Sequence, residues 1–157
     1  MKNILLGLAL LLFLPVSYAA KVTAQITIPK LNVAEYHRPY VAIWIENKKR
    51  KQVAQITLWL EQEKWHRDLR SWWRRGGKSL KLPVDGVSGA TRKPGQHTVS
   101  QSIDLPAGDY TINFESVREV GGREYIKIPF SWNGETVSVE KQGKTELGQV
   151  RFTIAQN

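Results

Sequence analysis

The chain has 157 residues and a formal net charge of +9 at pH 7, and it contains no cysteine. Without cysteine it cannot form disulfides, carry a lipid on an N-terminal cysteine, attach a c-type haem or ligate an iron–sulfur cluster. The length is that of one domain and is sufficient for a hydrophobic core of its own.

The first nineteen residues are typical of a cleavable secretion signal. Lys2 precedes an apolar run over residues 4–14, and Ser17 and Ala19 place small residues at the two positions that a signal peptidase reads. The run is too short for a membrane anchor, since a spanning helix needs about 20 apolar residues. We expect cleavage after Ala19, which leaves residues 20–157 as a single periplasmic domain without an integral membrane segment.

The beginning of the mature chain alternates apolar and polar residues, as half-buried strands do. Residues 22–28 place valine, alanine or isoleucine at every second position. Residues 40–46 and 55–61 repeat the pattern on either side of a charged stretch, residues 47–51. This arrangement predicts a β-hairpin with a charged tip.

The next stretch has a helical period. Trp65, Leu69, Trp72 and Trp73 fall on one helical face, and Gly76-Gly77 would end the helix. We expect a short helix that crosses from one sheet to another, with these tryptophans capping the hydrophobic core.

The same region is strongly basic. Seven cations and a single acid lie between residues 64 and 81, and such a charge run is ordinarily a solvated face. An exported protein meets little nucleic acid, so the charge does not indicate a nucleic-acid partner. It favours anionic lipid, lipopolysaccharide or an acidic protein.

Residues 76–95 form a long connection that offers few apolar anchors, and we expect it to be exposed and mobile. Loops of this length are uncommon unless they are functional. At its centre, residues 85–91 are a run of small side chains that ends in the hydroxyl of Thr91 and is followed by Arg92 and Lys93. The alternative interpretation is an ordinary exposed turn, because glycine, serine and aspartate favour turns in any protein.

Five further strands are predicted after this connection, separated by glycine-containing turns: residues 98–104, 110–117, 124–130, 136–140 and 149–154. About eight short strands without a βαβ rhythm predict an all-β fold. We expect an immunoglobulin-like antiparallel β-sandwich with one short helix and a long exposed loop that carries residues 85–91.

Residues 85–91 resemble the sequence at which a periplasmic flavin transferase joins flavin mononucleotide (FMN) to threonine through a phosphodiester. Covalent-flavin subunits of the sodium-translocating quinone reductase and its Rnf relatives carry such a sequence. By this resemblance Thr91 is the acceptor. The other residues of the predicted cofactor site are Asp85, Ser88, Gly89, Ala90 and Arg92.

These residue types suit the chemistry that the resemblance implies. A threonine hydroxyl must enter another enzyme's active site to attack phosphorus, so Gly86 and Gly89 would let the backbone approach closely. Ser88 and Ala90 would keep the flanks thin, and Asp85 would position the loop or assist a metal during transfer. Arg92 and Lys93 would face the phosphodiester and favour a reduced, anionic flavin.

Further stretches share a second likeness: residues 40–47, Trp65, Asp68-Leu69, Trp72, residues 85–91, Gly95, Gly108-Asp109-Tyr110, Glu115 and residues 118–122. Together they resemble the predicted periplasmic proteins of domain of unknown function 2271, over nearly all of the mature chain. Members of that family tend to be encoded with PepSY-type membrane reductases and flavin transferases.

The two resemblances imply a periplasmic electron-transfer protein with FMN attached to Thr91 by a flavin transferase. It would exchange electrons with a PepSY-type membrane reductase or another periplasmic redox protein, and would not be an autonomous enzyme. Trp72 or Trp73 could then pack against the isoalloxazine ring. The alternative is a binding module on which exposed tryptophans and the basic stretch hold a polysaccharide, lipopolysaccharide or an acidic protein.

Other sites are weakly indicated. His37, His66 and His97 lie too far apart in the sequence to suggest a metal site. Glu115 and Glu119 would not face each other as a glycosidase requires. We expect one of them to form an ordinary cross-strand ion pair with Arg118 or Arg123, and we assign no catalytic residue.

Overall fold

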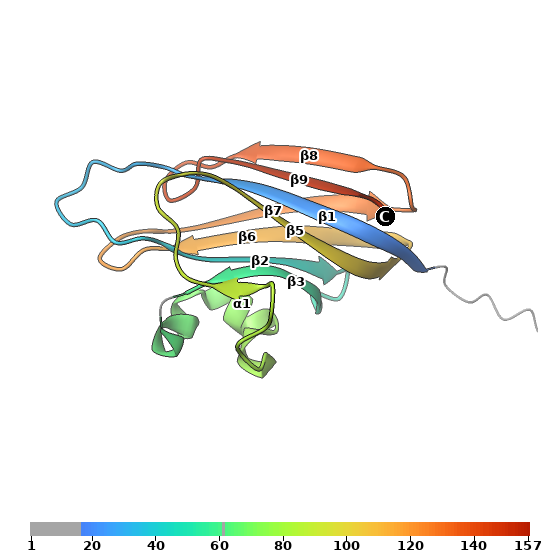
Figure 1. Cartoon of the computed structure of the whole chain (residues 1–157), viewed down its shortest axis with the longest axis horizontal. Helices are drawn as coiled ribbons and strands as arrows, with labels where there is room; N and C mark the ends of the chain where they lie inside the picture. The colour runs from blue at the N-terminus through green and yellow to red at the C-terminus, as the bar shows by residue number, and fades with distance from the viewer. Residues whose placement is uncertain (1–16, 61) are drawn as a thin grey trace, which may run out of the picture.

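The computed structural model describes residues 17–60 and 62–157, which form two packed β-sheets with a layer of short helices beneath them (Figure 1). The four-stranded sheet has the order β5 (Gly95–Pro106), β1 (Ser17–Ile28), β9 (Gln149–Gln156) and β8 (Val137–Gln142). The five-stranded sheet has the order β4 (Ser88–Gly89), β3 (Gln52–Trp59), β2 (Tyr40–Asn47), β6 (Gly108–Val117) and β7 (Arg123–Trp132).

The predicted sandwich is confirmed, and each of the eight predicted strands is present with its ends displaced by a few residues. The predicted secretion signal lies mostly in residues 1–16, outside the described residues. Its last three residues, from Ser17 to Ala19, form the beginning of β1. There Tyr18 makes an edge-to-face contact with Trp132, with 6.2 Å between ring centroids.

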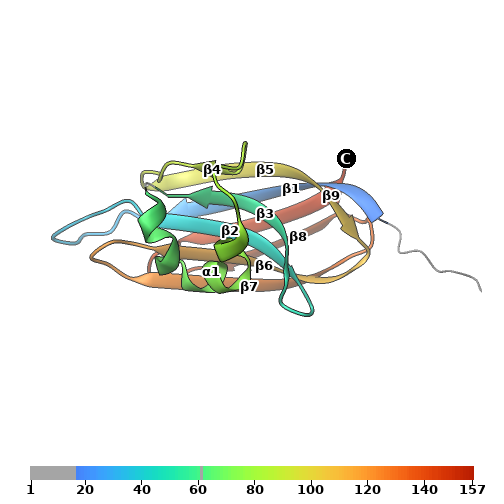
Figure 2. The same cartoon turned by 90° about the horizontal axis from the view of Figure 1, so that it is seen from below.

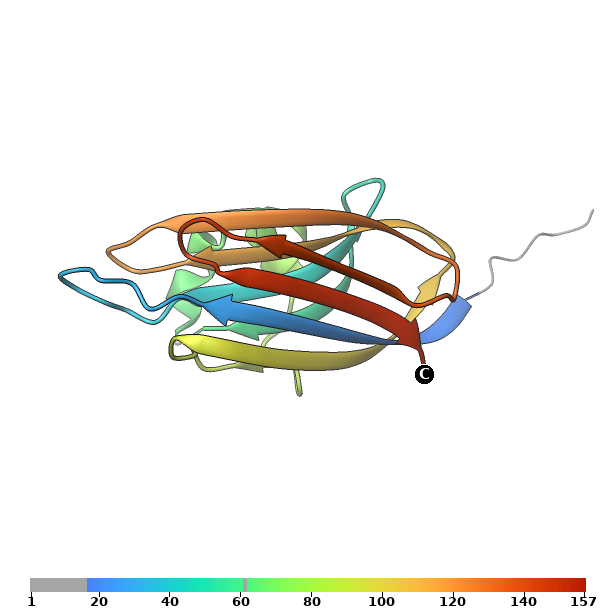
Figure 3. The ribbon, with the colours of Figure 1, turned by 90° about the horizontal axis from the view of Figure 1, so that it is seen from above.

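The main core lies between the two sheets and follows from the alternation in the sequence. In β1 every second side chain faces inward, and Ala20, Val22, Ala24, Ile26 and Ile28 are all buried. The facing strands contribute Val41, Ile43 and Phe114, among others, to the same cluster. Figure 3 shows the four-stranded sheet as one continuous layer over the other.

Strand β2 buries both of its faces, which explains its unbroken apolar run. Val41, Ile43 and Ile45 belong to the main core. A second, smaller cluster lies on the outer face of the sheet. It consists of Tyr40, Ala42 and Trp44 of β2, Leu58 of β3, and Leu69 and Trp72. Figure 2 shows the helices lying across this outer face of β2 and β3.

The predicted single helix is two short helices and does not cross between the sheets. Residues 63–68 form the 3₁₀ helix η1 (Glu63–Asp68), and α1 (Arg70–Arg75) follows after a break at Leu69, whose ψ of 70° is not helical. A further 3₁₀ turn, η2 (Gly77–Ser79), completes what we call the helical layer. The predicted apolar face of this segment is confirmed for Leu69 and Trp72, which are both buried. These side chains cover the outside of the five-stranded sheet and not the sandwich core.

Gly77 marks a close approach within this layer. A side-chain carbon at position 77 would lie 2.6 Å from the Trp72 ring, so the indole leaves no room for any residue but glycine. The Trp72 ring nitrogen donates a hydrogen bond to Gln55 Oε1 at 2.7 Å, which satisfies its polar atom.

A buried carboxylate attaches the helical layer to the sheet. Glu115 on β6 is fully buried, and it accepts hydrogen bonds from the backbone N–H groups of Ser71 at 3.0 Å and Trp72 at 2.8 Å. Arg123 on β7 pairs with the same carboxylate at 2.7 Å. The cross-strand ion pair predicted for one of Glu115 and Glu119 is thus formed by Glu115 with Arg123. The same carboxylate also binds N–H groups that the first turn of α1 cannot satisfy itself.

Replacing Glu115 with alanine should lower the free energy of unfolding by about 2–4 kcal/mol, because it leaves Arg123 and two buried N–H groups without their acceptor. Urea unfolding followed by tryptophan fluorescence measures this. The matched control is Glu140→Ala, which breaks the exposed pair with Arg151 and should cost less than about 1 kcal/mol. Equal losses in the two variants would contradict the role of Glu115.

Candidate functional site

Residues 76–95 run along the edge of the five-stranded sheet and are exposed over most of their length. Asp85, Gly86, Gly89, Ala90 and Arg92 are all exposed, in agreement with the predicted loop. Ser88 is half-buried, and Thr91 is buried, with only 4 % of its surface accessible. The expectation that the hydroxyl of this residue is accessible is therefore wrong for this conformation of the chain.

A tight turn holds the beginning of the motif. The carbonyl of Val84 accepts hydrogen bonds from the backbone N–H groups of Val87 and Ser88, at 3.1 Å and 2.9 Å. The Ser88 hydroxyl donates to the same carbonyl at 2.9 Å and accepts from the Val84 N–H at 2.8 Å. Gly86, at the tip, has a φ of +70°, which favours glycine. The Asp85 carboxylate lies exposed in this turn.

The end of the motif is pinned to the sheet as a short parallel strand. In β4, Ser88 and Gly89 pair with Leu58 and Trp59 of β3. The N–H groups of Leu58 and Leu60 donate to the carbonyls of Val87 and Gly89, each at 2.9 Å. This pairing was not predicted, because a strand of two residues has no periodicity to detect.

Thr91 lies two residues beyond the end of β4 and is buried, so the chain turns this side chain inward after the edge pairing has ended. Its neighbours in the chain contact Trp59 of β3, whose ring belongs to the main core. The guanidinium of Arg92 lies 5.5 Å from the centroid of the Trp59 ring, and the His97 ring meets the same indole edge-on at 5.6 Å.

Sequence reasoning missed Trp59, His97 and Gln101 as neighbours of the motif. Gln101 on β5 donates a hydrogen bond to the Gly86 carbonyl at 2.6 Å. No signal in the sequence identifies these contacts, because they depend on β3 and β5 lying on either side of the connection.

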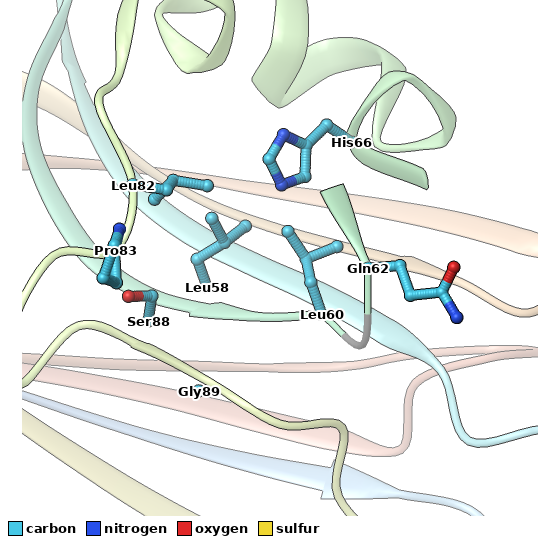
Figure 4. A pocket seen from close by; sticks show the side chains of 8 residues that line it. All are labelled: Leu58, Leu60, Gln62, His66, Leu82, Pro83, Ser88 and Gly89. Carbon is cyan, nitrogen blue, oxygen red and sulfur yellow. The ribbon is translucent and has the colours of Figure 1, made fainter. Parts of the chain in front are cut away.

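A hollow of about 270 Å³ lies beside the motif, on the outer face of the sheet (Figure 4). Leu58, Leu60 and Leu82 point into it and His66 overhangs it, while Ser88 and Gly89 form its side. The walls are apolar and the rim carries an imidazole, which suits a flat ring with polar edges.

The tryptophans are not a binding platform. Trp44, Trp59, Trp72 and Trp132 are buried, and Trp65 and Trp73 are half-buried. Trp72 is fully covered, so in this conformation it cannot touch a flavin. The alternative function, a binding module, was predicted from exposed tryptophans and the basic stretch. Only the basic stretch still supports it.

Two further groups of polar side chains are bonded within the fold. Arg118 and Glu146 form a buried ion pair at 3.0 Å, and the Glu146 carboxylate also accepts a hydrogen bond from the backbone N–H of Gly122. The Tyr125 hydroxyl donates to Asn113 at 2.7 Å, and burial beside Glu46 and Glu115 raises its pKa to about 12. Among residues 17–60 and 62–157, no three histidine or acidic side chains are grouped so that they could hold a metal ion.

Comparison with known proteins identifies a family. The family described as "predicted periplasmic protein (DUF2271)" matches residues 21–149, most of the chain. A comparison with curated proteins finds no significant match. In the part of the chain that the structure describes, no helix could cross a membrane.

Replacing Ser88 with alanine should loosen β4 without unfolding the domain, because the hydroxyl makes two hydrogen bonds that close the turn. The amides of Leu58 and Leu60 should exchange with solvent about fivefold faster, as expected for a loss of about 1 kcal/mol. Hydrogen exchange followed by NMR measures this, with the amide of Ile43 as an internal reference. Ser138→Ala, which removes an exposed hydroxyl contact, is the control and should leave both amides unchanged.

Proposed function

The chain belongs to the DUF2271 family of predicted periplasmic proteins, and on that premise we propose that it is a periplasmic electron carrier with FMN attached covalently to Thr91. A flavin transferase installs the flavin. The carrier then exchanges electrons with a PepSY-type membrane reductase or another periplasmic redox protein. The observation that carries this proposal is the intact Ser88-Gly89-Ala90-Thr91 run on an exposed connection at a sheet edge.

The hydrogen bonds of Ser88 support the choice of Thr91 as the acceptor. Both hydroxyls lie in the same run, but that of Ser88 is committed in both directions to the backbone of Val84. Using it as a nucleophile would open the turn on which β4 depends. Thr91 lies beyond the last residue of β4, so its reaction leaves that turn intact.

The surroundings fit a flavin once the segment that carries Thr91 opens. A side chain at Gly89 would meet no atom within 4 Å, so a transferase can approach the backbone closely there. The hollow beside Gly89 supplies apolar walls for a flat ring. Thr91 itself is covered in the closed segment, so attachment requires a local opening of residues 90–94.

We infer that this opening is a local native-state fluctuation. Glycines flank the segment, and Gly95 has a φ of +136°. The contacts to be given up include the Arg92 cation above Trp59 and a hydrogen bond between the His97 ring and the Lys93 carbonyl, at 2.8 Å. A cation–π contact at an exposed site is worth about 0.5–1 kcal/mol, and local openings commonly cost far less than global unfolding.

The chemistry assigned to this chain is that of a nucleophile and a carrier. The Thr91 hydroxyl oxygen attacks the flavin-side phosphorus of flavin adenine dinucleotide, a bond to AMP breaks, and the hydroxyl proton passes to the transferase. When bound, the flavin supplies one- and two-electron transfer. Arg92 and Lys93 place positive charge beside the attachment point, which favours an anionic reduced form.

The second candidate is a module that binds a polysaccharide, lipopolysaccharide or an acidic protein. The uncompensated basic stretch favours it, whereas the burial of the tryptophans does not. An intact mass measurement separates the two, since only the carrier gains a flavin-sized adduct when it is produced with a flavin transferase.

Thr91→Ala should abolish covalent flavin, because it removes the nucleophile, while Thr91→Ser and Ser88→Ala should retain it at least in part. Asp85→Ala should reduce labelling without unfolding the protein. Intact mass and in-gel flavin fluorescence after coexpression with a transferase measure the outcome. Since Thr91 is buried, its truncation should cost about 1 kcal/mol of stability, which urea unfolding checks.

Retention of flavin by Thr91→Ala through denaturing electrophoresis would contradict the acceptor assignment. A wild-type protein that never gains flavin beside an active transferase would favour the binding module.

Replacing Arg92 and Lys93 together with glutamine should lower the flavin midpoint potential by no more than about 20 mV, because exposed charges are screened by water and salt. The fraction of protein with attached flavin should stay high. Spectroelectrochemistry and intact mass measure the two quantities. Loss of attachment with an unchanged potential would instead assign these cations to recognition by the transferase.

A further inference from the structure

The helical layer and the two residues after it carry a concentration of positive charge. Six cations there are exposed, and we call them the basic surface: Lys64, Arg67, Arg70, Arg74, Lys78 and Lys81. The seventh cation of this stretch, Arg75, is half-buried and lies 3.5 Å from the buried carboxylate of Glu46. Arg70 and Arg74 are one helical turn apart in α1, so both project from the same face.

The described members of the basic surface form no ion pair with a described acid, although Arg70 lines a hollow together with Asp68 and Glu119. Among the described side chains, no acid lies within ion-pair distance of any member of the basic surface. Elsewhere, Arg118, Arg123 and Arg151 each have a carboxylate partner. Asp68, half-buried, is the acid closest in sequence to these cations with a described side chain.

The basic surface offers charge but no apolar anchor. Leu69 and Trp72 face the sheet and are buried. Trp65 and Trp73 are half-buried beneath cations, with Lys64 at 4.8 Å and Arg67 at 5.9 Å from the ring centroids. The exposed large apolar side chains of the described residues are Val33, Val53 and Val120, outside this layer.

These features favour one kind of partner. A specific protein interface is centred on buried aromatic or apolar anchors, which the basic surface lacks. A spread of exposed cations without such anchors matches a surface of many negative charges that need no fixed geometry. For an exported protein, an anionic phospholipid bilayer is such a surface.

We propose that the basic surface docks this protein reversibly onto an anionic phospholipid membrane. The contact is electrostatic and peripheral, because the apolar side of the helices is already used against β2 and β3 (Figure 2). Docking would also hold residues 85–91 near the bilayer, since they begin four residues after Lys81. The proposal does not depend on the flavin and applies to the unmodified chain.

Cosedimentation of the mature protein with phosphatidylglycerol vesicles at about 50 mM salt tests the proposal, with phosphatidylcholine vesicles as the uncharged reference. Replacing Arg70, Arg74 and Lys78 together with glutamine should weaken binding to phosphatidylglycerol vesicles roughly a hundredfold. The matched control removes the same charge from the β2–β3 hairpin tip, with Lys49, Arg50 and Lys51 replaced by glutamine, and should bind nearly as well as wild type. Raising the salt to about 500 mM should release the wild-type protein.

Three results would overturn the proposal: no wild-type binding to phosphatidylglycerol, equal binding to both lipids, or equal losses in the two triple variants. Binding of soluble polyglutamate without binding of vesicles would overturn it in favour of an acidic protein partner. Thermal unfolding confirms that each variant is folded, because all the exchanged cations are exposed.

Discussion

The outer face of the five-stranded sheet carries an apolar cluster over β2 and β3, and the need to cover it organises everything between β3 and β5. Tyr40, Ala42 and Trp44 would face water if the helical layer were absent. Leu69 and Trp72 cover them, and the buried carboxylate of Glu115 fixes the start of α1 in place. Because the helices occupy this face, the chain must return along the sheet edge, and that return carries residues 85–91.

Because residues 85–91 lie at the sheet edge, the two ends of this motif differ in their exposure and in how they are held. Its first part is held by a turn and by parallel pairing with β3, so Asp85 and Gly89 are presented in a defined way on the surface. Its last residue turns inward against the neighbourhood of Trp59. In the proposed function, recognition therefore uses the fixed part of the motif, and reaction uses the part that can open.

The helical layer has two sides with different tasks. Its inner side contributes stability through packing and through the bond network of Glu115. Its exposed residues include cations that form no ion pair with a described acid, and their mutual repulsion lowers the stability of the fold. If that side meets a membrane, the same element that covers the sheet also brings the motif to the place where a membrane reductase would reach it.

The sequence by itself determined the strands and the sandwich, because period-two alternation and turn residues are local patterns that can be recognised without the tertiary structure. The family followed from the resemblance of several stretches along the chain. The sequence also located the apolar face of Leu69 and Trp72, and it predicted an ion pair between Glu115 or Glu119 and Arg118 or Arg123, of which the structure selects Glu115 and Arg123. Only the tertiary structure decided that this face covers the outside of the sheet, that the helix breaks at Leu69, and that Ser88 and Gly89 join β3. The burial of Thr91 is of the same kind, since it depends on strands β3 and β5 that are distant in sequence and meet at one edge, and no local pattern encodes that meeting.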